Sequence, residues 1–173
     1  HRVVLYDQRG HGASTTGSDP VSVDRLGDDL AAVVEALDLR DAVVAGHSMG
    51  GMTAMAFACR HPDVRRDRVA RLVLVATAAH GLAGGGRDRF WRIVLWRGWL
   101  NRLMTRPRLG RAFVRGTFGR APRRAHVEAT RALFVGTPPG VRRDCALALG
   151  AMDLRDGLRA VDPDLPRMMR TLD

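Results

Sequence analysis

The stretch "VVAGHSMGGMTAMAFA", Val43 to Ala58, decides which fold the chain can adopt. A short apolar run leads into Gly-His-Ser-Met-Gly, and a pattern typical of a helix follows at once. Glycines two positions before and two positions after Ser48 allow the chain to turn sharply, where bulky side chains would collide with the neighbouring strand and helix. The stretch therefore predicts a strand, a tight turn and a helix, with Ser48 held in a strained and exposed position.

A serine in such a turn can act as a nucleophile only with help from other groups. Its hydroxyl needs a base, a group that orients the base, and donors that stabilise an oxyanion. The backbone N–H of Met49 is predicted to point to where the oxyanion forms, beside the positive end of the following helix. In the alternative interpretation Ser48 is a small residue that fits a tight turn. His47 and His11 are interpreted as locally packed histidines and not as the base.

The segments around this stretch alternate between strand and helix patterns. Short β-branched runs indicate buried strands, and apolar residues that recur every three or four positions indicate helices. The predicted order is a strand at Arg2–Tyr6, a loop at Asp7–Thr15, a helix at Val21–Leu39, a strand at Ala42–Ala45, a helix at Gly50–Arg60 and a strand at Val69–Thr77. Gly10 and Gly12 are expected to adopt backbone angles that other residues resist. This order predicts an α/β fold with parallel strands, and the continuous apolar strands predict a sheet covered on both faces.

After Ala78 the sequence changes character. A glycine-rich hinge, residues 80–89, precedes a region with helical patterns only. The predicted helices are Asp88–Met104, Leu109–Phe118, Pro122–Val135 and Val141–Met152. This region holds all three tryptophans, Trp91, Trp96 and Trp99, and four of the five phenylalanines. These aromatic side chains either line a pocket for an apolar substrate or form the core of a small helical subdomain.

These features together resemble the α/β-hydrolase fold family from about Arg2 to Thr77. The resemblance rests on a strand followed by Asp7-x-Arg9-Gly10-x-Gly12-x-Ser14, then a helix, then the Gly-x-Ser-x-Gly turn. It implies a three-layer α/β fold with a parallel sheet. Residues 1–79 would be a partial core, residues 80–150 a helical cap, and residues 151–173 the start of the return to the core.

The same resemblance implies roles for the residues of the turn. Ser48 would be the catalytic nucleophile and the Met49 N–H an oxyanion donor, while Gly46, Gly50 and Gly51 would shape the turn. No cofactor and no metal ion is implied. The branches of the family that use an aspartate nucleophile are disfavoured because a serine occupies this position.

The family pattern also includes parts that this sequence lacks. In the family an acid and a histidine follow the nucleophile, but no histidine follows His126, and the sequence after Leu165 reads "PRMMRTLD". The first strands and a His-Gly loop are missing ahead of Arg2. We therefore expect a fragment of a longer hydrolase, marginally stable and inert alone. Its strands Arg2–Tyr6 and Ala42–Ala45 would pair directly or leave unpaired backbone edges.

Charge, apolar runs and cysteine spacing bear on nucleic-acid binding, membrane insertion and metal binding. The net charge is +10, and the 28 basic residues are all arginines scattered along the 173-residue chain. This scatter disfavours specific nucleic-acid binding, and a basic polyanion-binding module is kept as an alternative. No apolar run is long enough for a membrane span. Cys59 and Cys145 lack the spacing of metal ligands and are interpreted as free thiols of a cytoplasmic protein.

The favoured function is hydrolysis of a small apolar ester through acyl-Ser48, as the resemblance to esterases and lipases implies. Haloperoxidase-like and peptidase-like members of the family are alternatives, as is a catalytically inert fragment or pseudoenzyme. The oligomeric state is left open.

Overall fold

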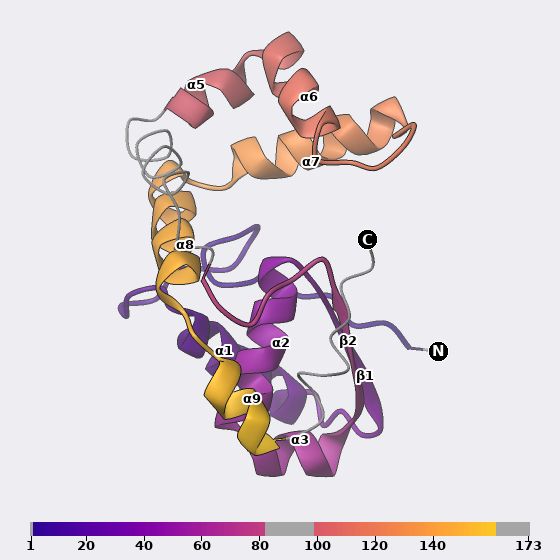
Figure 1. Cartoon of the computed structure of the whole chain (residues 1–173), viewed down its shortest axis with the longest axis vertical. Helices are drawn as coiled ribbons and strands as arrows, with labels where there is room; N and C mark the ends of the chain where they lie inside the picture. Colours follow the sequence, from indigo (N-terminus) through magenta and orange to yellow (C-terminus); the bar gives the residue numbers. More distant parts are fainter. Residues whose placement is uncertain (1, 82–98, 162–173) are drawn as a thin grey trace. The chain divides into compact units, whose positions relative to one another are not determined.

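The computed structural model of the chain describes residues 2–81 and 99–161 (Figure 1). The described residues fall into two compact units. One unit contains those among residues 1–20 and 84–146, and the other contains those among residues 21–83 and 147–173. The division into core, cap and return segment at residues 79 and 150 stays a prediction. No helix in the described ranges has the length and apolar character needed to cross a membrane.

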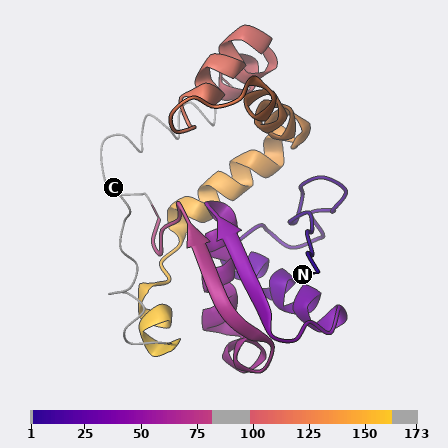
Figure 2. The same cartoon turned by 90° about the vertical axis from the view of Figure 1, so that its right-hand side faces the viewer.

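The unit that contains Ser48 is built around two parallel strands. Its elements are α1 (Val23–Ala36), β1 (Ala42–His47), α2 (Met49–Arg60), α3 (Pro62–Arg68), β2 (Val69–Val75) and α9 (Arg155–Val161). Gly46 of β1 lies opposite Leu74 of β2, and His47 lies opposite Val75 (Figure 2). The predicted alternation of helices with parallel strands is therefore observed.

Helix α2 forms the centre of this unit. All residues from Gly51 to Ala58 are buried, and Met55 and Phe57 are completely inaccessible to solvent. A helix that is apolar on all sides must be covered on all sides. Helices α1 and α9 and the sheet cover it, and Val23 and Leu158 join Met55 in one apolar cluster.

Helix α1 begins two residues after the predicted start at Val21 and packs closely against α2. The Ser22 hydroxyl oxygen accepts a hydrogen bond of 3.0 Å from the backbone N–H of Arg25, which caps the helix. Leu26 and Val34 are almost completely buried. A Cβ atom on Gly27 would lie 2.7 Å from the backbone nitrogen of Phe57. The glycine therefore permits close contact between the two helix backbones.

A charged cluster joins α1 to the end of α2. The Asp28 carboxylate accepts a hydrogen bond of 2.8 Å from Nε of Arg60 and lies 2.8 Å from Nε2 of His61. The hydrogen bond from Arg60 is the largest influence that holds the pKa of Asp28 below its ordinary value. Because the carboxylate stays ionised at neutral pH, the pairing adds to the apolar contact between the helices.

Two expectations about the sheet are wrong. Residues 2–6 form no strand, and Leu5 is exposed. A strand requires a hydrogen-bonding neighbour, and in the described part of the chain β1 and β2 pair only with each other. The sheet is also not covered on both faces, since Val43 is 60% exposed and Val75 49% exposed. Burial alternates along β1, as expected for a strand packed on one face.

Neither α3 nor α9 is predicted from the sequence. Pro62 follows the end of α2, as expected for a residue that discourages helix continuation, but it also lies in the first turn of α3. Proline fits there because its missing N–H would lack a partner in that turn in any case. Helix α9 has only seven residues, and its Leu158 is buried in the cluster around α2. Tertiary packing accounts for α9 better than local periodicity does.

The other unit consists of helices and the N-terminal loop. Its helices are α5 (Trp99–Thr105), α6 (Pro107–Arg115), α7 (Arg124–Gly136) and the first part of α8 (Pro139–Ala151). Phe113, Phe118 and Phe134 pack against a core of buried residues. For these phenylalanines the interpretation as a subdomain core is confirmed. Trp91 and Trp96 lie outside the described residues, as does most of the predicted helix Asp88–Met104.

The N-terminal loop has the expected backbone conformations. Gly10 and Gly12 have φ angles of 74° and 51°, which confirms the prediction for both. The loop closes on Asp7, whose carboxylate accepts a hydrogen bond of 2.9 Å from the N–H of Ala13. Its backbone carbonyl accepts one of 2.7 Å from the Ser14 hydroxyl.

The contact between α1 and α2 gives a first testable prediction. Gly27→Ala places a methyl group against the backbone of α2 and should lower the free energy of unfolding by about 1–3 kcal/mol. Gly150→Ala is the matched control, because Gly150 is also helical and a Cβ there meets nothing within 4 Å. Urea unfolding followed by circular dichroism measures both variants. Equal effects of the two substitutions would contradict the proposed close approach.

Candidate active site

Ser48 lies in the turn that joins β1 to α2. Its φ and ψ angles are 52° and −118°, a backbone conformation that costs a residue with a side chain about 1–3 kcal/mol. The residue is exposed to solvent. The strand, tight turn and helix predicted from the glycine spacing are all present, and the serine has the predicted strained and exposed geometry.

The end of β2 holds this turn in place. The backbone N–H of Ser48 donates a hydrogen bond of 2.9 Å to the carbonyl of Val75. The Ser48 carbonyl accepts one of 2.8 Å from the Thr77 hydroxyl and one of 3.0 Å from the N–H of Gly51. These bonds on both sides of the peptide stabilise the strained conformation.

Thr77 is a residue of the site that sequence reasoning does not single out. It was included in the predicted strand, but β2 ends at Val75 because Ala76 has a φ of 45°. This bend allows the Thr77 hydroxyl to reach the Ser48 carbonyl. The available signal was a polar residue at the end of an apolar strand, where the carboxyl ends of parallel strands lie together.

The three glycines of the turn differ in how strongly the structure requires them. A Cβ on Gly46 would lie 2.3 Å from the carbonyl oxygen of Gly50, and a Cβ on Gly51 would lie 2.7 Å from side-chain atoms of Thr77. A Cβ on Gly50 meets nothing within 4 Å. The expectation that a side chain would collide at both flanking glycines is therefore met at Gly46 and not at Gly50.

The Ser48 hydroxyl is not used in capping the helix. Although Ser48 is the N-cap residue of α2, its side chain makes no capping hydrogen bond. Met49 is the first residue of α2, so its N–H has no acceptor within the helix. The first turn of α2 contains no acidic residue. A negatively charged oxygen beside Ser48 would thus meet an N–H donor and the positive end of a helix.

In the described part of the chain no histidine hydrogen-bonds to Ser48. The His47 side chain is on an exposed position of β1, and that of His61 is paired with Asp28. Nδ1 of His80 lies 2.8 Å from the carbonyl oxygen of Gly81. Ser48 is therefore a candidate nucleophile and the Met49 N–H a candidate oxyanion donor, and none of the described histidines is hydrogen-bonded to Ser48 as a base would be.

Asp153 lies beside His80 in the fold. It forms an isolated antiparallel bridge with His80, but its side chain accepts hydrogen bonds from Arg155. These bonds are the main cause that lowers the pKa of Asp153. The carboxylate is thus engaged by an arginine and does not orient a histidine toward Ser48.

The described residues include no group of three or more His, Cys, Asp or Glu side chains that could hold a metal ion. Cys59 and Cys145 are free thiols. Burial raises the pKa of both thiols, which keeps them protonated at neutral pH. Neither cysteine is therefore suited to act as a nucleophile.

Comparison with known proteins points to one family. The model of the alpha/beta hydrolase fold matches residues 1–117. A putative carbamate hydrolase, RutD, of Caulobacter sp. strain K31 is 47% identical over 75 residues, which are 43% of this chain and 26% of that protein. The bifunctional esterase/perhydrolase DCH of Acinetobacter calcoaceticus is 45% identical over 75 residues, with the same shares of the two chains.

Solved structures agree with this match. The esterase EaEST from Exiguobacterium antarcticum has a TM-score of 0.71 and 23% identity, over 89% of this chain and 57% of that chain. The enol-lactonase from Burkholderia xenovorans LB400 has a TM-score of 0.66 and 26% identity, over 91% of this chain and 57% of that chain. The chain thus spans little more than half the length of these structures and about a quarter of the curated relatives.

The steric difference between the glycines is testable. Gly46→Ala should lower the free energy of unfolding by about 3 kcal/mol, the upper end of the range for an added methyl group in a packed site. Gly50→Ala, two residues beyond Ser48, should leave it within about 0.5 kcal/mol of the parent value. Urea unfolding midpoints measure both. A harmless Gly46→Ala would mean that residue 46 does not lie against the start of α2.

The hydrogen bond of Thr77 gives a second test. Thr77→Val removes the hydroxyl with little change of shape and should cost about 1 kcal/mol of unfolding free energy. Thr77→Ser keeps the hydroxyl and should retain more of the stability. If the valine variant is as stable as the parent, the bond to the Ser48 carbonyl contributes nothing to the turn.

Proposed function

Because the chain belongs to the α/β-hydrolase fold family, we propose that the full-length protein is a serine hydrolase that cleaves small apolar carboxylic esters through acyl-Ser48. The observation that carries this proposal is the backbone of Ser48, held at a φ of 52° between β1 and α2. Such strain persists only where surrounding structure maintains it, and it is concentrated at functional sites.

The proposed reaction follows from the atoms around this turn. Ser48 Oγ attacks the ester carbonyl carbon while a base removes the hydroxyl proton, and the carbonyl oxygen becomes an oxyanion. The N–H of Met49 donates a hydrogen bond to this oxyanion, and the dipole of α2 stabilises its charge. Collapse of the intermediate breaks the bond to the alcohol, which takes the proton from the base. Water then releases the acid from Ser48 by the same steps.

The names of similar proteins support a substrate of this class. They include an esterase/perhydrolase, a 3-oxoadipate enol-lactonase and a putative carbamate hydrolase. In esters and lactones alike the acyl carbon carries an oxygen leaving group, which a serine nucleophile can displace. We propose that residues 80–150 are the helical cap of the protein. The apolar character of the substrate rests on the three tryptophans of that region, because Phe113, Phe118 and Phe134 pack in the core of the helical unit.

A second candidate concerns the 173-residue chain by itself, which we propose is catalytically inert. Within its described residues no histidine hydrogen-bonds to Ser48, and Asp153 is engaged by Arg155. Loss of the base reduces turnover by about 10⁴-fold or more in serine hydrolases, which leaves only the effects of binding and the oxyanion donor.

A fluorophosphonate probe tests the proposed nucleophile. We expect the full-length protein to be labelled at Ser48, because the probe reacts with a serine whose hydroxyl is activated and exposed. Ser48→Ala should abolish the labelling, as measured by fluorescence in a gel and by mass spectrometry of the labelled peptide.

Ser18→Ala is the matched control, since Ser18 is also exposed but lies in the N-terminal loop. It should leave labelling and ester turnover unchanged. A folded full-length protein that is not labelled, or is labelled equally in Ser48→Ala, would falsify the assignment. Ester turnover by the 173-residue chain at the rate of the full-length protein would overturn the second candidate.

A further inference from the structure

The helical unit carries positive charge that its own acidic residues do not balance. Glu128 is the only acidic residue between positions 99 and 136, a stretch that contains many arginines. In the unit around α2, by contrast, arginines pair with aspartates, as Arg60 does with Asp28 and Arg68 with Asp38. The excess charge of the chain is therefore concentrated on α6, α7 and the residues beside them.

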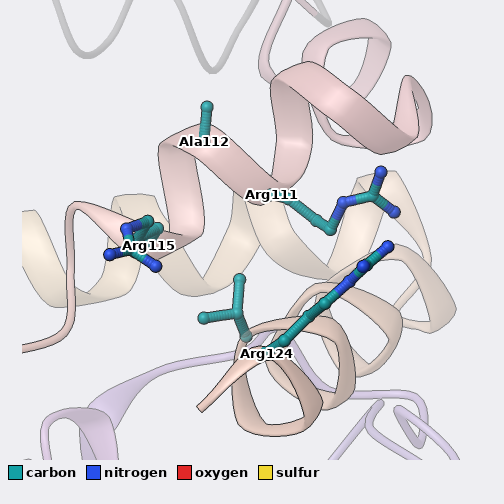
Figure 3. Close-up of a pocket in the computed structure, with 5 residues that line it drawn as sticks. Arg111, Ala112, Arg115 and Arg124 are labelled. Carbon is teal, nitrogen blue, oxygen red and sulfur yellow. The ribbon is translucent and has the colours of Figure 1, made fainter. Parts of the chain in front are cut away.

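A pocket with a volume of about 230 Å³ lies between α6 and α7. It is lined by Arg111, Ala112 and Arg115 of α6 and by Arg124 and Val127 of α7. Figure 3 shows the side chains of Arg111 and Arg124 extending to the same side of the pocket, while Arg115 points to the other. The wall of the pocket is almost entirely apolar, so the alkyl parts of the arginines line it together with Ala112 and Val127, and the guanidinium groups lie at its edge.

Carboxylates within the protein satisfy these arginines only in part. Glu128 accepts short hydrogen bonds of 2.9 and 2.6 Å from Arg131, which lies outside the pocket lining. The distance from Glu128 to Arg111 is longer, at 3.4 Å. In the described part of the chain, Arg115 and Arg124 take part in no ion pair. Among the described residues, Glu128 is thus the one carboxylate that pairs with any of the three arginines of the pocket, and it is shared with Arg131.

The start of α7 adds to this positive potential. The helix begins at Arg124, and neither a capping side chain nor an acidic residue is present in its first turn. The N–H of His126 donates to the carbonyl of Arg123, while the positive end of the helix dipole has no acidic side chain in its first turn to neutralise it. Like charges are brought together here at an electrostatic cost, which a bound anion would remove.

We propose that this pocket binds a small organic anion, with its carboxylate or phosphate group between Arg111 and Arg124 and its apolar part against Ala112 and Val127. Guanidinium groups match the planar geometry of such oxyanions and form two hydrogen bonds to them. The pocket volume of about 230 Å³ suits a molecule of a few heavy atoms rather than a polymer. This site goes beyond the proposed ester hydrolysis and does not depend on Ser48.

Titration of the ¹⁵N-labelled 173-residue chain with butanoate, acetate and inorganic phosphate tests the proposal. Arginine Nε–Hε signals report directly on the groups that bind. We expect saturable shifts of the Arg111 and Arg124 signals and an affinity for butanoate several-fold higher than for acetate, because its chain contacts the apolar surface. Tighter binding of phosphate than of butanoate would assign a phosphate-bearing ligand, and the reverse a carboxylate.

Arg124→Gln should weaken binding about tenfold, as expected for the loss of charge-assisted hydrogen bonds. Arg120→Gln is the matched control, because Arg120 is exposed, changes the net charge equally and does not line the pocket. It should change the affinity less than twofold. Ser48→Ala should also leave binding unchanged, so failure of the hydrolase assignment and failure of this one are separable.

Three outcomes would overturn the proposal. Equal weakening by Arg124→Gln and Arg120→Gln would show attraction by net charge alone. Equal affinity for acetate and butanoate would show that the apolar surface does not contribute to binding. Chemical shifts that do not saturate would show that there is no specific site. If Arg124→Gln alters the circular dichroism spectrum, the affinity of the Arg111→Gln variant for butanoate tests the same site, and it should also be lower than that of the parent chain.

Discussion

The hydrogen bonds between the end of β2 and the backbone of Ser48 are the constraint on which the candidate site depends. A serine at a φ of 52° would relax if its neighbours allowed it. The Val75 carbonyl holds its N–H and the Thr77 hydroxyl holds its carbonyl, so that the peptide groups on either side are both fixed. The bend at Ala76 is part of the same arrangement, because it ends β2 and turns Thr77 toward the serine.

Burial of α2 provides the rigid support for this turn. The helix is covered by α1, the sheet and α9, and it begins at the residue after Ser48. A serine placed between a strand and a largely buried helix has little freedom to move, and such positions give more accurate geometry than loops do. Gly27 and Gly46 serve the same end, since each allows backbone segments to approach where a methyl group would separate them.

Charge is distributed differently in the two units, although arginines occur along the whole sequence. Around α1, α2 and α3, arginines face aspartates across elements, including the pair Arg40 and Asp67. In the helical unit Glu128 meets Arg131 and Arg111, and further arginines have no such partner in the described residues. The net charge of +10 therefore combines a unit around α2 in which arginines are paired with aspartates and a helical unit with an excess of arginines. This difference supports anion binding at α6 and α7 rather than a general affinity for polyanions.

Local sequence determined the α/β order, the limits of α1 and α2 to within a few residues, and the strained turn at Ser48. Each of these depends on short-range features, namely apolar periodicity and glycines at fixed spacing. Only the tertiary structure decided that residues 2–6 form no strand, that one sheet face is open, that Gly50 is not sterically required, and that Thr77 holds the serine. The physical reason is that strand pairing, burial and steric contact depend on residues far away in the chain, which a local pattern does not specify.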